Sequence, residues 1–120
     1  MAQILLADDD KATRDLVKRA LEIDGHKVDL TQDGTEALEK LTASPAAIDL
    51  LVSDVHMPGM DGIDLARRAI EIAPRVKLLL MSGFAEELER AQGLKSPHLG
   101  VILKPFTLDQ IRAAIRTLLA

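Results

Sequence analysis

The sequence predicts an α/β fold, a doubly wound sandwich in which five parallel strands alternate with five helices. Five short apolar runs alternate with segments of helical periodicity, and no repeat or low-complexity linker interrupts them. Because 120 residues suffice for one domain with its own core, we expect residues 1–120 to form a single domain. Hydrophobic residues make up 48% of the chain and aromatic residues only 2%, so that core must be aliphatic, which suits a sheet covered by helices.

The five apolar runs are the predicted strands. Residues 27–31 alternate polar and apolar side chains, which predicts a strand with one wet side at an edge of the sheet. The other four runs are nearly continuously apolar and predict buried parallel strands over residues 3–7, 48–53, 76–81 and 99–103.

Four of the intervening segments carry apolar residues at helical spacing. Their stripes are Leu16, Val17, Ala20 and Leu21; Ala37, Leu38 and Leu41; Ala66, Ala69, Ile70 and Ala73; and Leu108, Ile111, Ile115 and Leu118. Segment 85–94 has only Leu88 and Ala91 as apolar anchors, so we expect a loosely docked helix with a solvated acidic face there. Asp10 and Asp61 directly precede the first and third helical segments and predict N-caps.

Composition excludes several classes of function. A formal net charge of -4 lacks the basic footprint of a nucleic-acid surface. The absence of cysteine excludes disulfides, thiolate catalysis and Cys-ligated zinc. No apolar run approaches the roughly 20 residues that span a bilayer, and no signal peptide is recognisable. We therefore expect a cytoplasmic protein that binds neither nucleic acid nor membrane.

Polar residues stand at the carboxyl ends of four predicted strands, where a doubly wound sheet binds its ligands. They are Asp8, Asp9 and Asp10 after the first strand, Asp54 after the third, Ser82 after the fourth and Lys104 after the fifth. Carboxylates about 5 Å apart would repel by roughly 3 kcal/mol per pair at an effective dielectric near 20, so the cluster needs a cation. Oxygen ligands without cysteine or paired histidine select a hard ion, and we expect Mg²⁺.

The residues at these strand ends form a pattern of known type. The chain carries, in order, Asp8-Asp9, the stretch DVHMPGMDG at 54–62, Ser82 and Lys104-Pro105-Phe106. With them it resembles the CheY-like receiver domains of response regulators over its whole length. The resemblance implies a flavodoxin-like sandwich with sheet order 2-1-3-4-5 and a role in the phosphorelay signalling of two-component systems.

The resemblance also implies the chemistry of the site. Asp54 would accept the phosphoryl group of a phosphohistidine on a histidine kinase or histidine phosphotransferase. Asp9, Asp54 and the backbone carbonyl of His56 would bind Mg²⁺, and Asp8 would hold the ion through water. Lys104 would add a second positive charge. Enzymatic activity would be limited to phosphoryl transfer to, and hydrolysis from, the chain's own Asp54.

The expected output begins at Ser82, whose hydroxyl would donate to a phosphoryl oxygen and pull the following loop inward. This movement would alter the face made by the fourth helix, the fifth strand and the fifth helix, where a protein target would bind. Many receivers carry a rotating aromatic ring three residues before the lysine. This chain has Val101 there, so the output must follow another route.

Finer resemblances leave alternatives open. The start at Asp8, the stretch SGFA at 82–85 and Val101 are most similar to single-domain receivers of the CpdR type from alphaproteobacteria, which are phosphorylation-controlled adaptors of a protease. Similar stretches occur in hybrid histidine kinases, so a receiver excised from such a kinase is an alternative. A Mg²⁺-dependent aspartyl-phosphate phosphohydrolase is a third, although it would carry a second Asp where this chain has His56. The three histidines lack the spacing of a zinc site.

Overall fold

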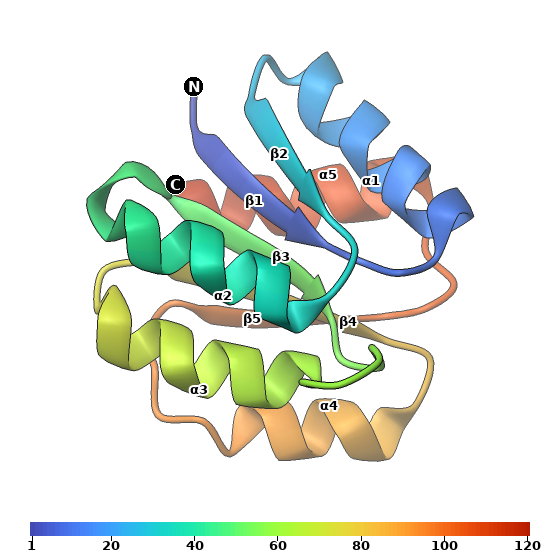
Figure 1. Cartoon of the computed structure of the whole chain (residues 1–120). Coiled ribbons are helices and arrows are strands. Elements are labelled where there is room, and N and C mark those ends of the chain that lie inside the picture. The colour runs from blue at the N-terminus through green and yellow to red at the C-terminus, as the bar shows by residue number, and fades with distance from the viewer.

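Five parallel strands form the middle layer of the structure, a computed structural model that describes all residues from 1 to 120 (Figure 1). The elements in chain order are β1 (Gln3–Ala7), α1 (Lys11–Ile23), β2 (Lys27–Thr31), α2 (Gly34–Ala43), the 3-10 helix η1 (Pro45–Ala47), β3 (Leu50–Asp54), α3 (Gly62–Ile72), β4 (Lys77–Ser82), α4 (Ala85–Gln92), β5 (Leu99–Leu103) and α5 (Leu108–Leu119). The sheet order is β2-β1-β3-β4-β5, which confirms the predicted doubly wound α/β sandwich.

Two aliphatic cores lie on opposite faces of this sheet. On one face, strand residues such as Leu5, Leu51 and Leu78 pack with side chains from α2, α3 and α4. On the other face, residues such as Leu6 and Val52 pack with side chains from α1 and α5. Successive residues of the central strands therefore enter different cores, which explains why their sequences are continuously apolar.

The two edges of the sheet were not equally predictable. β2 lies at one edge, as its alternating pattern predicts. The prediction that residues 99–103 form a buried strand is wrong in part, because β5 is the opposite edge and has a neighbour on one side only. Its residues are half-buried, and Leu103 is 51% exposed.

Both boundaries of β3 and of β4 differ from the prediction: β3 ends at Asp54 and not at Ser53, and β4 begins at Lys77 and not at Val76. β3 begins at Leu50 and not at Ile48, because η1 occupies residues 45–47 and Ile48 is its C-terminal cap residue. β4 extends to Ser82, since Ser82 still pairs with Leu103 of β5.

The helix starts show why α4 differs from the other four α-helices. The Asp10 and Asp61 side chains accept hydrogen bonds from Thr13 N–H and Asp64 N–H, which confirms both predicted N-caps. α2 and α5 have side-chain caps of the same kind, but α4 begins after Phe84 with none. As predicted, α4 docks through buried Ala91 and half-buried Leu88. None of the helices has the length and apolar composition needed to cross a membrane.

Candidate functional site

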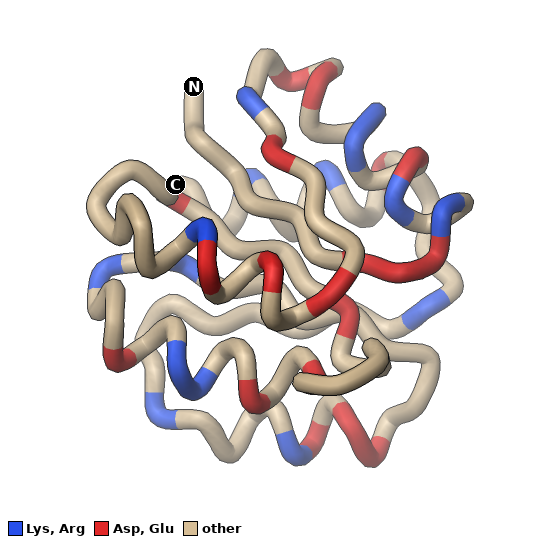
Figure 2. Tube along the Cα trace, in the orientation of Figure 1, with Lys and Arg blue, Asp and Glu red and all other residues tan.

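The carboxyl ends of four parallel strands bring the predicted site residues together. They lie along the edge of the sheet that runs across these strand ends, which is distinct from the edge strands β2 and β5. Asp8 follows β1, Asp54 ends β3, Ser82 ends β4 and Lys104 follows β5. Figure 2 shows acidic residues gathered at this edge, with a continuous run of them between β1 and α1. The chain reverses its strand order between β1 and β3, so the edge beside these strands is where such a sheet binds ligands.

Three carboxylates converge at this edge. Asp8, Asp9 and Asp54 each offer an oxygen atom, and these atoms all lie within 4.8 Å of one another. Asp8 is fully buried and Asp54 is 6% exposed, whereas Asp9 faces solvent. The cluster therefore has a buried floor and an open side, which suits an ion that keeps some of its water.

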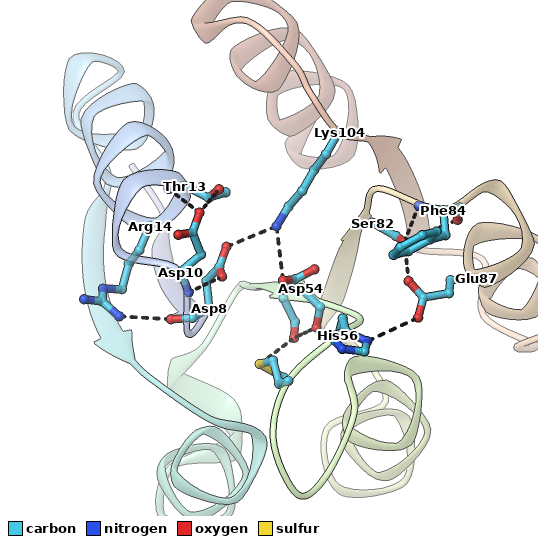
Figure 3. Close-up of polar contacts among 12 residues, drawn as sticks. Asp8, Asp10, Thr13, Arg14, Asp54, His56, Ser82, Phe84, Glu87 and Lys104 are labelled. Atoms are coloured by element: carbon cyan, nitrogen blue, oxygen red, sulfur yellow. Dashed lines mark hydrogen bonds and ion pairs between the residues drawn. The ribbon is translucent and has the colours of Figure 1, made fainter.

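Lys104 is the cation beside the two buried carboxylates. Its Nζ lies 3.1 Å from Asp54 Oδ2 and 3.7 Å from Asp8 Oδ2 (Figure 3). The Lys104-Pro105 peptide bond is cis, and Lys104 N–H donates to the carbonyl of Ser82 at the end of β4. One lysine cannot neutralise three carboxylates, so the site retains a negative charge.

The electrostatics of the buried pair point to a missing positive charge. Burial raises the pKa of Asp8 from its usual 3.8 to about 6, although the Asp10 backbone N–H and Lys104 act in the opposite direction. Burial also raises the pKa of Asp54, against the lowering effect of Lys104. Asp8 Oδ2 is buried and accepts no hydrogen bond. A buried carboxylate oxygen without a hydrogen-bond partner, surrounded by other carboxylate oxygens as possible metal ligands, is a good fit for a hard divalent cation such as Mg²⁺.

Backbone contacts hold the site in shape from two sides. Asp10 N–H donates to Asp8 Oδ1 at 2.9 Å, and the Arg14 guanidinium donates to the Asp8 carbonyl at 3.1 Å. On the other side, α3 begins directly against the end of β3, where a Cβ on Gly62 would lie 2.2 Å from the Asp54 carbonyl oxygen. Only glycine fits there without moving Asp54.

The Ser82 hydroxyl does not contact the acidic cluster. Ser82 is 1% exposed, and its Oγ lies 2.5 Å from Glu87 Oε1 and accepts a hydrogen bond from Phe84 N–H at 2.9 Å. No hydrogen bond joins Ser82 to Asp54; in Figure 3 the contacts of Ser82 run to α4. The predicted contact of Ser82 with a phosphoryl oxygen therefore requires its hydroxyl to turn.

His56 lies beyond Asp54, on the loop that follows β3. Its side chain is 83% exposed, and its Nδ1 lies 3.8 Å from Glu87 Oε2 (Figure 3). The metal-binding role of the His56 carbonyl stays a prediction, as do the individual roles of the other site residues.

Two residues of this site were not expected from the sequence, Arg14 and Glu87. The solvated acidic face predicted for segment 85–94 includes Glu87, but the Glu87 side chain is only 19% exposed. Its five-residue spacing from Ser82 is the one signal that could have indicated the contact, and this spacing is too common to be diagnostic.

Comparison with known proteins defines the class. A family model described as the response regulator receiver domain matches residues 4–116. The chain belongs to this family, so it is a receiver domain of the two-component signalling type. Members of the family interact with histidine kinases and bind Mg²⁺ through acidic residues.

Its relatives include full-length regulators and isolated receivers. The chain is 36% identical over 117 residues to the response regulator MprA of Mycobacterium leprae (strain TN), covering 98% of this chain and 50% of that protein. For MprA of Mycobacterium ulcerans (strain Agy99) the identity is 35% with the same coverage. The chain thus spans about half the length of the curated relatives that it matches. These relatives give no support to the resemblance to CpdR-type receivers.

Solved structures agree with the fold. A response regulator receiver protein from Sinorhizobium medicae WSM419 has a TM-score of 0.86 at 34% identity, covering 98% of this chain and 94% of that chain. The receiver domain of the hybrid histidine kinase CckA has a TM-score of 0.83 at 28% identity, covering 98% and 99%.

Proposed function

We propose that this receiver domain is switched by Mg²⁺-dependent phosphorylation of Asp54. The observation that supports the proposal is the cluster of buried Asp8 and Asp54 with exposed Asp9, which Lys104 neutralises only in part. A phosphohistidine of a histidine kinase or histidine phosphotransferase is the proposed donor. In the same proposal, residues 1–120 act as one receiver unit in the cytoplasm.

The reaction needs little covalent chemistry from the protein. A carboxylate oxygen of Asp54 attacks the phosphorus of the phosphohistidine, the P–N bond breaks as the P–O bond forms, and the imidazole leaves with the electron pair. Catalysis then depends on positioning and on positive charge around the transferring group. Hydrolysis of the same aspartyl phosphate by water resets the domain, and we propose no enzymatic activity beyond these two steps.

Each charged residue has a distinct part in this proposal. Asp9, Asp54 and the His56 carbonyl would hold Mg²⁺ directly, with Asp8 holding it through water. When bound, the ion supplies the positive charge that neutralises the phosphoryl oxygens. Lys104, whose Nζ already lies 3.1 Å from Asp54 Oδ2, would add a second positive charge.

The output is proposed to be a change in protein contacts at the face of α4, β5 and α5. Phe84 and Leu103 are exposed apolar residues beside and on this face. A protease, as for CpdR-type adaptors, is one target of this kind. The alternative of a receiver belonging to a hybrid histidine kinase has the support of the CckA neighbour, whose chain is covered to 99%.

Intact-mass spectrometry after incubation with acetyl phosphate and Mg²⁺ tests the proposal. Wild type should gain one phosphoryl group, and Asp54→Asn should gain none. Asp64→Asn, which changes an exposed aspartate on α3, should behave as wild type. A phosphoryl adduct that persists in Asp54→Asn would contradict the proposal.

A further inference from the structure

The hydroxyl of Ser82 has one proton, and Glu87 is the nearer of its two acceptors, since the Phe84 carbonyl oxygen lies 3.3 Å from Ser82 Oγ. The 2.5 Å separation of Ser82 Oγ and Glu87 Oε1 is in the range of a charge-assisted O–H to carboxylate hydrogen bond. The hydroxyl oxygen is occupied as well, because Phe84 N–H donates to it. Ser82 can therefore donate to a phosphoryl oxygen on Asp54 only after it leaves Glu87 (Figure 3).

The same contacts fasten the start of α4. This helix has no side-chain cap of its own, and Glu87 lies in its first turn. The Ser82 side chain ties this turn to the end of β4 through hydrogen bonds with Glu87 and with the N–H and carbonyl groups of Phe84. Loss of the Glu87 bond would leave this turn, which has no side-chain cap, held to the end of β4 by the Phe84 contacts of Ser82 alone.

We propose that Glu87 is a positioning residue that holds Ser82 in the unphosphorylated state, and that its release couples phosphorylation of Asp54 to the start of α4. The inference rests on the proposed function. It supplies the route that Val101 leaves open, since the signal passes from Ser82 to α4 directly and needs no aromatic ring on β5.

The competition follows from charge. Glu87 and a phosphoryl group are both anionic acceptors for one proton, so Ser82 can serve only one of them at a time. A phosphoryl group carries up to about two negative charges and would also repel the Glu87 carboxylate. Ser82 is bonded either to Glu87 or to the phosphoryl group. Phosphorylation of Asp54 therefore releases the first turn of α4 from the end of β4.

Hydrogen exchange of the α4 amides tests the restraint in the unphosphorylated protein. Glu87→Ala removes the acceptor for Ser82, and Glu86→Ala is the matched control, because it removes a first-turn carboxylate that has no hydrogen bond or ion pair. We expect exchange of the amides at 87 and 88, which donate to the Phe84 carbonyl, to be about tenfold faster in Glu87→Ala than in wild type, as for loss of one hydrogen bond to a charged group. Glu87→Gln keeps a neutral acceptor and should lie between them.

Phosphorylation kinetics separate positioning from a merely structural effect. With acetyl phosphate and Mg²⁺, Glu87→Ala should accelerate formation of the adduct by about three- to tenfold, because Ser82 is free to donate to the incoming group. The same substitution in a Ser82→Ala background should change the rate by less than about twofold. Thermal melts of all variants check that each is folded.

Three results would count against the inference alone, and a fourth would count against the proposed function as well. Equal exchange in Glu87→Ala and Glu86→Ala would overturn it and leave the proposed function untouched, as would a slower reaction of Glu87→Ala or an equal effect in both backgrounds. A wild-type protein that gains no phosphoryl group at all would overturn the proposed function and this inference with it.

Discussion

Asp8 and Asp54 are buried carboxylates that share one lysine. Buried charge is costly unless it is paired and hydrogen-bonded, and here Asp8 Oδ2 has no hydrogen-bond partner. The raised pKa values of both groups express the same cost. The two buried carboxylates therefore lower the stability of the metal-free protein, and in the proposed function a bound cation would offset this cost.

Asp8→Asn tests whether the buried carboxylate costs stability and contributes to Mg²⁺ binding. The substitution keeps the acceptor for Asp10 N–H but removes a buried charge, so we expect the metal-free protein at neutral pH to gain about 1 kcal/mol in the free energy of unfolding. The rise in Tm that Mg²⁺ produces in wild type should shrink strongly. Differential scanning calorimetry with Mg²⁺ or with chelator measures both effects. Asp15→Asn, at an exposed position of α1, is the control, and an unchanged Mg²⁺ response in Asp8→Asn would refute the account.

Single residues also mark where sequence reasoning reached its limit. Asp8, Asp54 and Lys104 could be predicted to meet because parallel strands deliver their carboxyl ends to one edge. The direction of the Ser82 hydroxyl could not, because it depends on Glu87 of a helix whose periodicity is weak. Composition makes Glu87 look like its exposed neighbours on α4, and only its packing separates them.

At the scale of elements, the site depends on how closely α3 approaches β3. Gly62 is the first residue of α3 and contacts the backbone of Asp54 and Val55. Sequence alone offers Gly62 as part of a motif and gives no reason for it. The structure supplies the reason, since a side chain there would push β3 and α3 apart.

Gly62→Ala should therefore destabilise the protein by about 2 to 3 kcal/mol, as overpacking against backbone does. Gly83→Ala is the matched control, because a Cβ at Gly83 would meet no atom within 4 Å. Urea denaturation compares the two. Equal stabilities of the two variants would show that α3 can move away from Asp54 at little cost.

Asp24 joins two other elements, the end of α1 and the middle of α5. Its Oδ1 lies 2.7 Å from Arg112 Nη2 and 3.0 Å from Arg116 Nη2. The hydrogen bond from Arg112, with further help from Arg116, lowers the pKa of Asp24 to about 2. Neither helix pattern predicts this junction, since the residues are separated by most of the chain.

The pH dependence of this junction follows from the sign of the shift. A carboxylate whose pKa is lower in the folded than in the unfolded state stabilises the fold above its usual pKa of 3.8, and loses that contribution as pH falls toward about 2. We expect Asp24→Asn to be less stable than wild type at neutral pH, with the difference closing between about pH 4 and pH 2. Denaturation at several pH values measures this. A difference that grows on acidification would contradict the assignment.

On the scale of the whole molecule, the fold was largely predictable because each element repeats one simple pattern. Nearly continuous apolar runs such as residues 3–7 predicted the buried strands, and the alternating pattern of β2 predicted its position at an edge of the sheet. The sequence of β5 is equally apolar, yet β5 is the other edge, because a strand's hydrophobicity reports its faces and not whether a neighbour pairs with it.

The position of the phosphoryl group is the most direct test of the account as a whole. Protein phosphorylated with acetyl phosphate and Mg²⁺ would be treated with borohydride, which reduces an aspartyl phosphate to homoserine, and its peptides sequenced by mass spectrometry. The account predicts homoserine in place of Asp54 and nowhere else, and none when Mg²⁺ is chelated. Modification at Asp8, Asp9, His56 or Ser82 with Asp54 intact would contradict it.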